Sequence, residues 1–264
     1  MTDAAQDAPA PFDTGQPNIA RVYDYLLGGK DNYEADRLLA EQLLSQQPGI
    51  QVNAQANRAF MQRVVRYIAT AGVDQFLDVG TGLPTGDNVH QIAQSVNPEA
   101  RIVYVDNDEV VAAHSRALLA SDRGVEFLHA DLRDPAEIIA RAGEMLDFSR
   151  PVALLLISML HFVPDDAVAT AIVEALTAPL AAGSFIVASH WQYVPADEEL
   201  AKQYSGAVHA IARRSREGIA ALLPSAWELV EPGLVPVTAW HPIDESPARR
   251  DTIQFMGVVA RKPD

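Results

Sequence analysis

The chain has 264 residues, of which 48 % are hydrophobic, and its formal net charge is −15. This is enough for one sizeable domain with a large core, and no apolar run reaches the roughly 18 residues that a membrane span needs. The negative charge repels a nucleic-acid backbone, and the lack of cysteine excludes disulfides, thiolate metal sites and cysteine nucleophiles. We therefore expect neither a nucleic-acid partner nor a membrane.

The first 70 residues divide into a tail and a helical segment. Residues 1–16 are acidic and rich in Pro and Ala, without the basic start and apolar core of a signal peptide, so we expect a disordered tail and a cytoplasmic protein. Residues 17–70 have helical patterns, the last of which places Phe60, Val64 and Ile68 on one face. The three helices are expected over 19–27, before a glycine pair, over 34–44 and over 57–70.

From residue 71 onward, short strand patterns alternate with helical ones. This indicates a parallel sheet that is covered by helices on both faces, with right-handed crossovers. We expect a doubly wound, Rossmann-like α/β domain over 71–264, ending in a hairpin whose last strand runs antiparallel to the rest. The strands are expected over 75–79, 101–106, 125–131, 151–158, 184–190, 227–240 and 252–261, with a long helix over 196–215 before the hairpin.

A glycine-rich turn, within LDVGTGLPTGDNVH, joins the first strand to the next helix. Gly80 and Gly82 allow a tight turn and close approach of a ligand to the backbone. Asp106 ends the second strand, where a carboxylate can accept both hydroxyls of a ribose. Asp131 ends the third and could accept the exocyclic amine of an adenine. Each feature is common alone, but together they predict a nucleoside site at the carboxyl ends of the strands.

The spacing in this turn separates two classes of nucleoside ligand. A dinucleotide site has G-x-G-x-x-G, whereas here three residues, including Pro84, lie between Gly82 and Gly86. Asp78 precedes the glycines, and an acidic group there repels pyrophosphate but suits a sulfonium or an α-amino group. The turn therefore fits S-adenosylmethionine better than NAD.

These residues resemble a class I S-adenosylmethionine-dependent methyltransferase. More narrowly, the chain is similar to a bacterial methyltransferase family long catalogued as a domain of unknown function. The resemblance rests on NIARVYDYLLGGKDNYEAD, QFLDVGTGLPT, ARIVYVDNDEVVAAHSRALL and LLLISMLHFVPDD, and it extends from Pro17 to the C-terminus. It implies a seven-stranded sheet in the order 3-2-1-4-5-7-6, with strand seven antiparallel, and S-adenosylmethionine as the methyl donor. It does not supply an acceptor.

The resemblance also implies which residues bind the cofactor. Carried over by position, they contact the methionine part (Asp78, Gly80, Thr81, Gly82), the ribose (Asp106, Asn107), the adenine (Asp131, Leu132) and the sulfonium (Ser158). Pro84 stands where many class I enzymes have a third glycine, which leaves residues 83–86 open as ligands.

Histidines near the strand ends are candidates for the chemistry. His161 lies nearest the point between strands one and four, which makes it the candidate general base, with a structural histidine as the alternative. His190 and Trp191 follow strand five and either line the acceptor pocket or pack in the core. A metal shared by His161, His190 and His241 is rejected, because strands four and six lie about 14 Å apart.

The best local candidate for a basic patch is IARRSREG, near residue 214. Arg213, Arg214 and Arg216 are interpreted as a solvated face near a helix end.

The turn YDYLLGGKDNYEAD raises a separate question. No strand precedes it, so it is not a phosphate loop. The glycine pair stops one helix, and Asp31 is expected to cap the next, with Glu34 three residues later. In the methyltransferases that the chain resembles, helices before the first strand often fold over the cofactor site. We therefore interpret residues 17–70 as a helical lid. The lid residues expected to face cofactor or acceptor are Tyr23, Asn32, Tyr33 and Arg58.

The leading hypothesis is a methyltransferase of a small-molecule acceptor, with no metal. A cofactor-binding or regulatory protein without catalysis remains an alternative, because no general base is unambiguous. A Rossmann oxidoreductase using NAD(P) is the third hypothesis, disfavoured by the loop spacing and the antiparallel last strand. The acceptor, the methylated atom and the oligomeric state are left open.

Overall fold

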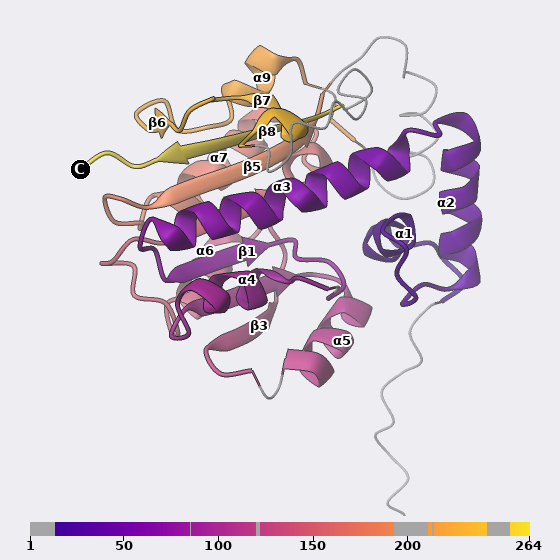
Figure 1. Cartoon of the computed structure of the whole chain (residues 1–264), viewed down its shortest axis with the longest axis horizontal. Coiled ribbons are helices and arrows are strands. Elements are labelled where there is room, and N and C mark those ends of the chain that lie inside the picture. The colour runs from indigo at the N-terminus through magenta and orange to yellow at the C-terminus, as the bar shows by residue number, and fades with distance from the viewer. Residues whose placement is uncertain (1–13, 85, 120–121, 193–210, 213, 242–253) are drawn as a thin grey trace, which may run out of the picture.

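Among the residues that the computed structural model describes, eight strands form a single sheet in the order β3-β2-β1-β4-β5-β8-β6, with β7 also paired to β8 (Figure 1). The structure describes residues 14–84, 86–119, 122–192, 211–212, 214–241 and 254–264. The strands are β1 (Gln75–Val79), β2 (Arg101–Asp106), β3 (Val125–His129), β4 (Ala153–Ile157), β5 (Phe185–Trp191), β6 (Glu228–Leu229), β7 (Val235–Pro236) and β8 (Phe255–Arg261).

The predicted topology is confirmed. Strands β1 to β5 are parallel, and β8 pairs antiparallel with β5 along its whole length. The prediction of seven strands is wrong in one detail, because the sixth is divided into β6 and β7. Between them Pro232 has no N–H to donate, and Gly233 turns the chain by donating from its N–H to the carbonyl of Val230 at 2.8 Å.

Several predicted boundaries shift by one to three residues. β3 ends at His129, so Asp131 lies beyond the strand; β4 ends at Ile157, and β5 extends to Trp191. His129, expected inside a strand, is the last residue of β3. Most of the helix expected over 196–215 and the loop between the last two strands lie outside the described residues. Helix α9 (Arg216–Ala220) begins just after this region.

Helices cover both faces of the sheet (Figure 1). One face carries α3 (Ile50–Thr70), α4 (Val89–Val96) and α5 (Glu109–Leu119), and the other carries α6 (Pro135–Ala142), α7 (Asp166–Thr177) and α9. Two 3₁₀ turns, η1 (Leu160–Phe162) and η3 (Val237–Ala239), lie after β4 and β7. Asp165 caps α7, its carboxylate accepting from the N–H groups of Ala167 and Val168.

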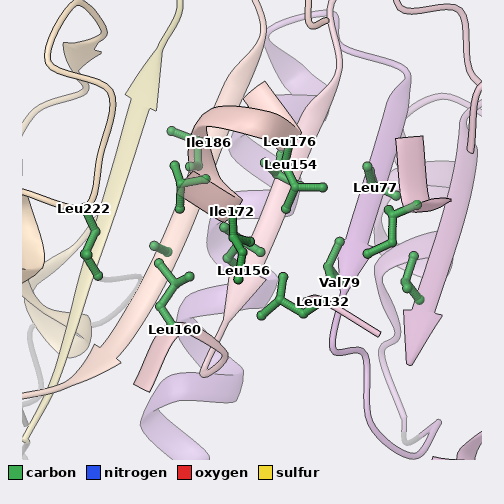
Figure 2. Close-up of a cluster of buried hydrophobic side chains, with 14 of the residues drawn as sticks. Leu77, Val79, Leu132, Leu154, Leu156, Leu160, Ile172, Leu176, Ile186 and Leu222 are labelled. Carbon is green, nitrogen blue, oxygen red and sulfur yellow. The ribbon is translucent and has the colours of Figure 1, made fainter. Parts of the chain in front are cut away.

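Successive side chains of each strand point to opposite faces of the sheet, so the strands contribute to two apolar cores, one on each face. In β1, Phe76 points to the side of α3 and α4, whereas Leu77 and Val79 point to the side of α6 and α7. Figure 2 shows the second core, where side chains of β1, β4 and β5 meet those of α7 and the segments around it. The labelled members are Leu77, Val79, Leu132, Leu154, Leu156, Leu160, Ile172, Leu176, Ile186 and Leu222.

Helix α3 begins at Ile50, seven residues before the predicted start. Asn53 and Asn57 are buried residues in the N-terminal part of this helix. Because these polar residues interrupt the apolar pattern, the pattern did not reveal where the helix begins. Phe60, Val64 and Ile68 are fully buried on the sheet, as predicted. Its N-terminal part extends past the sheet toward α1 (Ile19–Leu26) and α2 (Glu34–Gln46) (Figure 1).

Helices α1 and α2 form a small unit with the start of α3. Its own apolar core contains Val22, Leu26, Leu39, Ala40, Leu43, Ile50 and Ala54. The prediction that Asp31 caps α2 is wrong. Instead the helix begins after Tyr33, whose N–H donates to the Asp36 carboxylate at 2.8 Å. No helix among the described residues is both long enough and apolar enough to cross a membrane.

A buried carboxylate holds this unit together. Asp36 is fully buried and accepts three hydrogen bonds of 2.8 Å, from the N–H of Asn18, the N–H of Tyr33 and the guanidinium of Arg21. Arg21 is itself 3 % exposed, so the ion pair is fully desolvated. One side chain thereby joins the start of α1 to the start of α2.

Arg21→Met should lower the free energy of unfolding by about 3–5 kcal/mol, because it leaves the Asp36 charge buried without its partner. Urea unfolding followed by circular dichroism measures this. The control is Arg66→Met at an exposed position of α3, expected to change stability by no more than about 0.5 kcal/mol. Equal losses in the two variants would contradict the anchoring role of Asp36.

Candidate functional site

The glycine turn after β1 lies against β2 and β4. The N–H groups of Gly80 and Thr81 both donate to the carbonyl of Val105, at 2.7 and 3.2 Å. Gly80 has φ +80°, and a Cβ there would lie 1.9 Å from the sulfur of Met159. Both the backbone angle and the contact therefore require glycine.

Asp106, at the end of β2, fixes the second half of this turn. Its carboxylate accepts from the N–H of Gly82 at 2.9 Å and from the N–H of Asp108 at 3.0 Å. Burial raises the pKa of Asp106, and these hydrogen bonds oppose the rise. The turn and the predicted ribose-binding carboxylate thus form one connected structure.

The predicted adenine-side residues also lie together. The Asn107 amide donates to the Asp131 carboxylate at 3.0 Å, and the N–H of Arg133 donates to it at 2.8 Å. Burial acts to raise the pKa of Asp131, but the hydrogen bonds from Arg133 and Asn107 hold it below its usual value. Leu132, in contrast, packs in the core on the side of α6 and α7 (Figure 2).

Asp78 is a buried carboxylate at the other end of the turn. It is 7 % exposed, and burial raises its pKa to about 7, partly offset by the nearby positive charge of Arg58 and by a hydrogen bond with Thr81. Asp78 forms no salt bridge with any described residue. It therefore lacks a close cationic partner at a position where a charge is costly.

Arg58 of α3 lies over the same turn. Its guanidinium donates from Nη2 to the carbonyls of Gly86 and Asp87 and to the side chain of Asn88, at 3.1 to 3.2 Å. Its Nε–H is buried without a partner, and no described carboxylate forms a salt bridge with it. Thus one carboxyl group and one guanidinium lie beside the turn, close enough to interact, but form no salt bridge with each other.

A hydrogen-bonded chain joins the lid to the end of β4. Tyr23 donates from its hydroxyl to the carbonyl of Ala54 at 3.1 Å and accepts from the Asn57 amide at 3.2 Å. The same amide donates to the Ser158 hydroxyl at 3.3 Å. Ser158 has φ +60°, an uncommon angle for a residue other than glycine, and its N–H is held by Ser189 at 3.0 Å.

Asn57 is a candidate site residue that was not predicted from the sequence. A signal was present, because Asn57 lies four residues before Met61 and seven before Val64, on the buried stripe of α3. A polar residue that continues an apolar stripe is buried with its hydrogen-bonding groups, and it needs partners there.

The two candidate histidines are buried neighbours. The rings of His161 and His190 lie 5.5 Å apart, centroid to centroid. Arg214 donates to Nε2 of His190 at 2.9 Å, so this nitrogen accepts, and Nδ1 donates to the carbonyl of Trp191 at 2.8 Å. Burial lowers the pKa of His190 to about 4 and that of His161 well below its usual value. Both rings are therefore neutral near pH 7.

Arg214 corrects one interpretation of the sequence. It was expected on a solvated face, but it is 4 % exposed and buried beside β4 and β5. Besides His190, it binds the carboxylate of Asp166 at 2.7 Å and the carbonyls of Leu160 and Val163. It positions η1, which contains His161. Arg216 is exposed as predicted, and Arg213 lies outside the described residues.

His241 does not join the other two histidines. Its ring lies 5.3 Å from Tyr67 and 4.3 Å from Trp240, beside α3. Within the described part of the chain, no group of three His, Asp or Glu residues is arranged to hold a metal ion.

Trp191 connects β5 to the lid. Its ring stacks on Phe255 at 6.1 Å, its Nε1–H donates to the side chain of Gln254 at 2.6 Å, and it packs against the core of α1 and α2.

The turn between α1 and α2 is organised by Asp24. Its carboxylate accepts from the N–H of Asp31 at 3.0 Å and from the Asn32 amide at 2.9 Å, and it closely approaches Gly29, where a Cβ would lie 2.0 Å from it. Asn32 therefore has structural partners within the lid, and the Tyr33 ring lies 5.3 Å from the Arg21 guanidinium. As contacts to a cofactor, Asn32 and Tyr33 stay predictions.

Helix α1 lies over the glycine turn. The Asn18 amide donates to Asp108, just after β2, at 2.6 Å, and Ala20 lies 4.0 Å from where a Cβ of Gly82 would be. The helices before the first strand thus reach the carboxyl ends of β1 and β2, where the sequence places a cofactor.

Nearly the whole chain matches a known protein family. Residues 5–263 match the family described as S-adenosyl methyltransferase. The chain belongs to this family. A candidate methyltransferase from Thermobifida fusca is 42 % identical, with a TM-score of 0.89 over 96 % of this chain and 97 % of that one. A DUF574 family protein from Streptomyces avermitilis is 41 % identical, with a TM-score of 0.88 over 95 % and 99 %. No curated protein matches the chain.

The fold extends to distant S-adenosyl methyltransferases. Human N-acetylserotonin methyltransferase, solved in complex with S-adenosylmethionine, is 16 % identical, with a TM-score of 0.50 over 95 % of this chain and 64 % of that one. The cofactor of the family is S-adenosylmethionine. This replaces the nicotinamide hypothesis.

The residues at the strand ends fit this cofactor. Gly80 has no side chain that would keep a ligand from the backbone of the turn. The carboxylate of Asp106 can accept from the hydroxyl groups of a ribose, and that of Asp78 can bind an ammonium group. Buried polar atoms without partners lie around the same edge, on Asn57 (Oδ1), Arg58 (Nε) and His161 (Nδ1). Unpaired buried polar atoms are uncommon, and a polar ligand would satisfy them.

Asp78 gives the S-adenosyl methyltransferase a pH-dependent stability. The unfolded chain releases this proton near the usual pKa of an aspartate and the folded chain only near pH 7, so rising pH favours unfolding in that window. Relative to wild type, Asp78→Asn should become more stable as pH rises from 4 to 7, by up to about 1.4 kcal/mol per pH unit. Urea unfolding at several pH values measures the difference, and parallel curves for the two proteins would rule out the raised pKa.

Proposed function

We propose that the protein transfers a methyl group from S-adenosylmethionine to a small-molecule acceptor. The observation that carries this is the pair Asp78 and Arg58, groups of opposite charge held at the glycine turn, neither of which forms a salt bridge with the other or with another described residue. Together they complement an α-amino acid zwitterion, with the ammonium at Asp78 and the carboxylate at Arg58. Asp106 then takes the ribose, and Asp131 with Asn107 the adenine.

The lid supports a small acceptor. Helix α1 is fastened to Asp108 through Asn18 and to α3 through Tyr23, so it covers the edge of the sheet where the methyl group would lie. The formal charge of −15 disfavours a nucleic-acid acceptor. Transfer removes a positive charge from sulfur, and alignment with exclusion of water supplies much of its acceleration.

The state of the histidines favours an alternative, a protein that binds the cofactor without catalysis. His161 and His190 are both neutral, and their depressed pKa values make them weak bases. A methyltransferase with this site needs an acceptor that reacts without a strong base. If the protein binds S-adenosylhomocysteine but methylates none of the small molecules tested, the hypothesis of a cofactor-binding protein without catalysis is favoured.

Calorimetric titration with S-adenosylhomocysteine tests the cofactor site. We expect binding by the wild type, and a loss of about tenfold or more in Asp106→Ala, which removes the acceptor of two ribose hydroxyls. The exposed Glu99→Ala serves as the control and should bind as the wild type does. Unchanged affinity in Asp106→Ala would refute the ribose assignment.

A second titration tests the zwitterion. Arg58→Gln should weaken S-adenosylhomocysteine by about tenfold or more, since a charge-assisted hydrogen bond is lost. 5′-Methylthioadenosine lacks the amino acid group and should bind both proteins equally. Arg66→Gln, on the same helix but exposed, is the matched control. An equal loss for both ligands would mean that Arg58 supports the turn and does not contact the carboxylate.

A further inference from the structure

The orientation of the Asn57 amide is fixed by its neighbours. Tyr23 gives its hydroxyl proton to the carbonyl of Ala54, so its oxygen must accept from Asn57. The amide nitrogen therefore faces Tyr23 and Ser158, and the side-chain oxygen faces the other way. This oxygen is buried and has no partner.

Asn57 lies where the strand order of the sheet reverses. The nucleoside acids Asp106 and Asp131 follow β2 and β3, on one side of β1. Asn57 binds Ser158 at the end of β4, on the other side of β1, where the strand order reverses. A cofactor that spans from β3 to β1 would have its reactive part near this point, within reach of Asn57.

We propose that the Asn57 side-chain oxygen accepts a hydrogen bond from the attacking amine of the methyl acceptor, a primary or secondary amine bound in its neutral form. This rests on the proposed function and names the substrate class of the same site. The hydrogen bond from one N–H holds the nitrogen so that its lone pair is directed at the methyl carbon. Asn57 is thereby a specificity-determining residue of the acceptor site.

The balance of the transfer explains why an amine suits the site and a hydroxyl does not. The nitrogen lone pair forms the new N–CH₃ bond as the C–S bond breaks, and the C–S electron pair stays on sulfur. The positive charge moves to nitrogen, which keeps its proton until the product reaches water. No base is needed in this step, in agreement with the neutral His161 and His190. The hydrogen bond to Asn57 strengthens as the charge develops on nitrogen, so it favours the transition state over the bound amine.

The test uses binding of two cofactor analogues and needs no identified acceptor. Sinefungin carries an amine where the methyl group stands, and S-adenosylhomocysteine has nothing there. We expect Asn57→Leu to weaken sinefungin by about tenfold or more, while S-adenosylhomocysteine changes by less than about threefold. Asn57→Asp keeps the shape of the side chain and adds a negative charge. It should therefore strengthen the binding of sinefungin relative to the binding of S-adenosylhomocysteine.

The control is Asn53→Leu, one turn earlier on α3. Asn53 is also buried, but its side chain bonds Gly49 and Gln254, whereas that of Asn57 bonds Ser158. Asn53→Leu should therefore change the affinities for both analogues by the same factor. Equal changes of both analogues in the two Asn57 variants would overturn the proposal. So would a crystal structure with sinefungin in which its amine lies outside hydrogen-bond distance of the Asn57 oxygen. Failure of the wild type to bind S-adenosylhomocysteine at all would instead refute the proposed function.

Discussion

The packing of α3 on the sheet is the constraint on which the site depends. Its C-terminal part is fixed by fully buried side chains such as Phe60 and Val64, and Phe60 fits against β8 because Gly257 leaves room, where a Cβ would lie 2.7 Å from the ring. Since the helix is continuous, this packing also fixes its N-terminal part beyond the sheet. Asn57 and Arg58 are thereby held over the ends of β1 and β4, and the lid core is built on the same helix.

The charges of the site are arranged around this helix. The positive charge of Arg58 partly offsets the cost of burying Asp78, but the two groups remain available to a ligand of opposite charges. On the other side of β4, Arg214 occupies the only basic nitrogen of His190 that could take a proton and holds η1 in place. The site combines a charged half, suited to an amino acid zwitterion, with a neutral polar half at Tyr23, Asn57 and Ser158. We assign the first half to the cofactor and the second to the acceptor.

The lid is coupled to the cofactor turn through side chains. Asp36 joins the starts of α1 and α2, and Asn18, bonded to both Asp36 and Asp108, connects this unit to the end of β2. Because Asp108 also donates its N–H to Asp106, these helices and the carboxylate that we expect to bind the ribose share one hydrogen-bond network. The turn YDYLLGGKDNYEAD thus folds around Asp24, and Tyr23 within it bonds to Ala54 and Asn57 of α3.

The sequence by itself determined the order of the elements, the doubly wound sheet, the glycine turn and the acids at the strand ends. These depend on local spacing and on apolar periodicity, which any reader of the chain can measure. Only the tertiary structure decided that Asn57 bonds Tyr23 and Ser158, that Arg214 is buried against His190 and that Asp36, not Asp31, organises the start of α2. In each case the decisive partner is distant in the sequence or lies on another element: Ser158 for Asn57, His190 for Arg214, Arg21 for Asp36. A polar side chain in a helix has the same pattern whether its partner is water or a buried group, and only packing distinguishes the two.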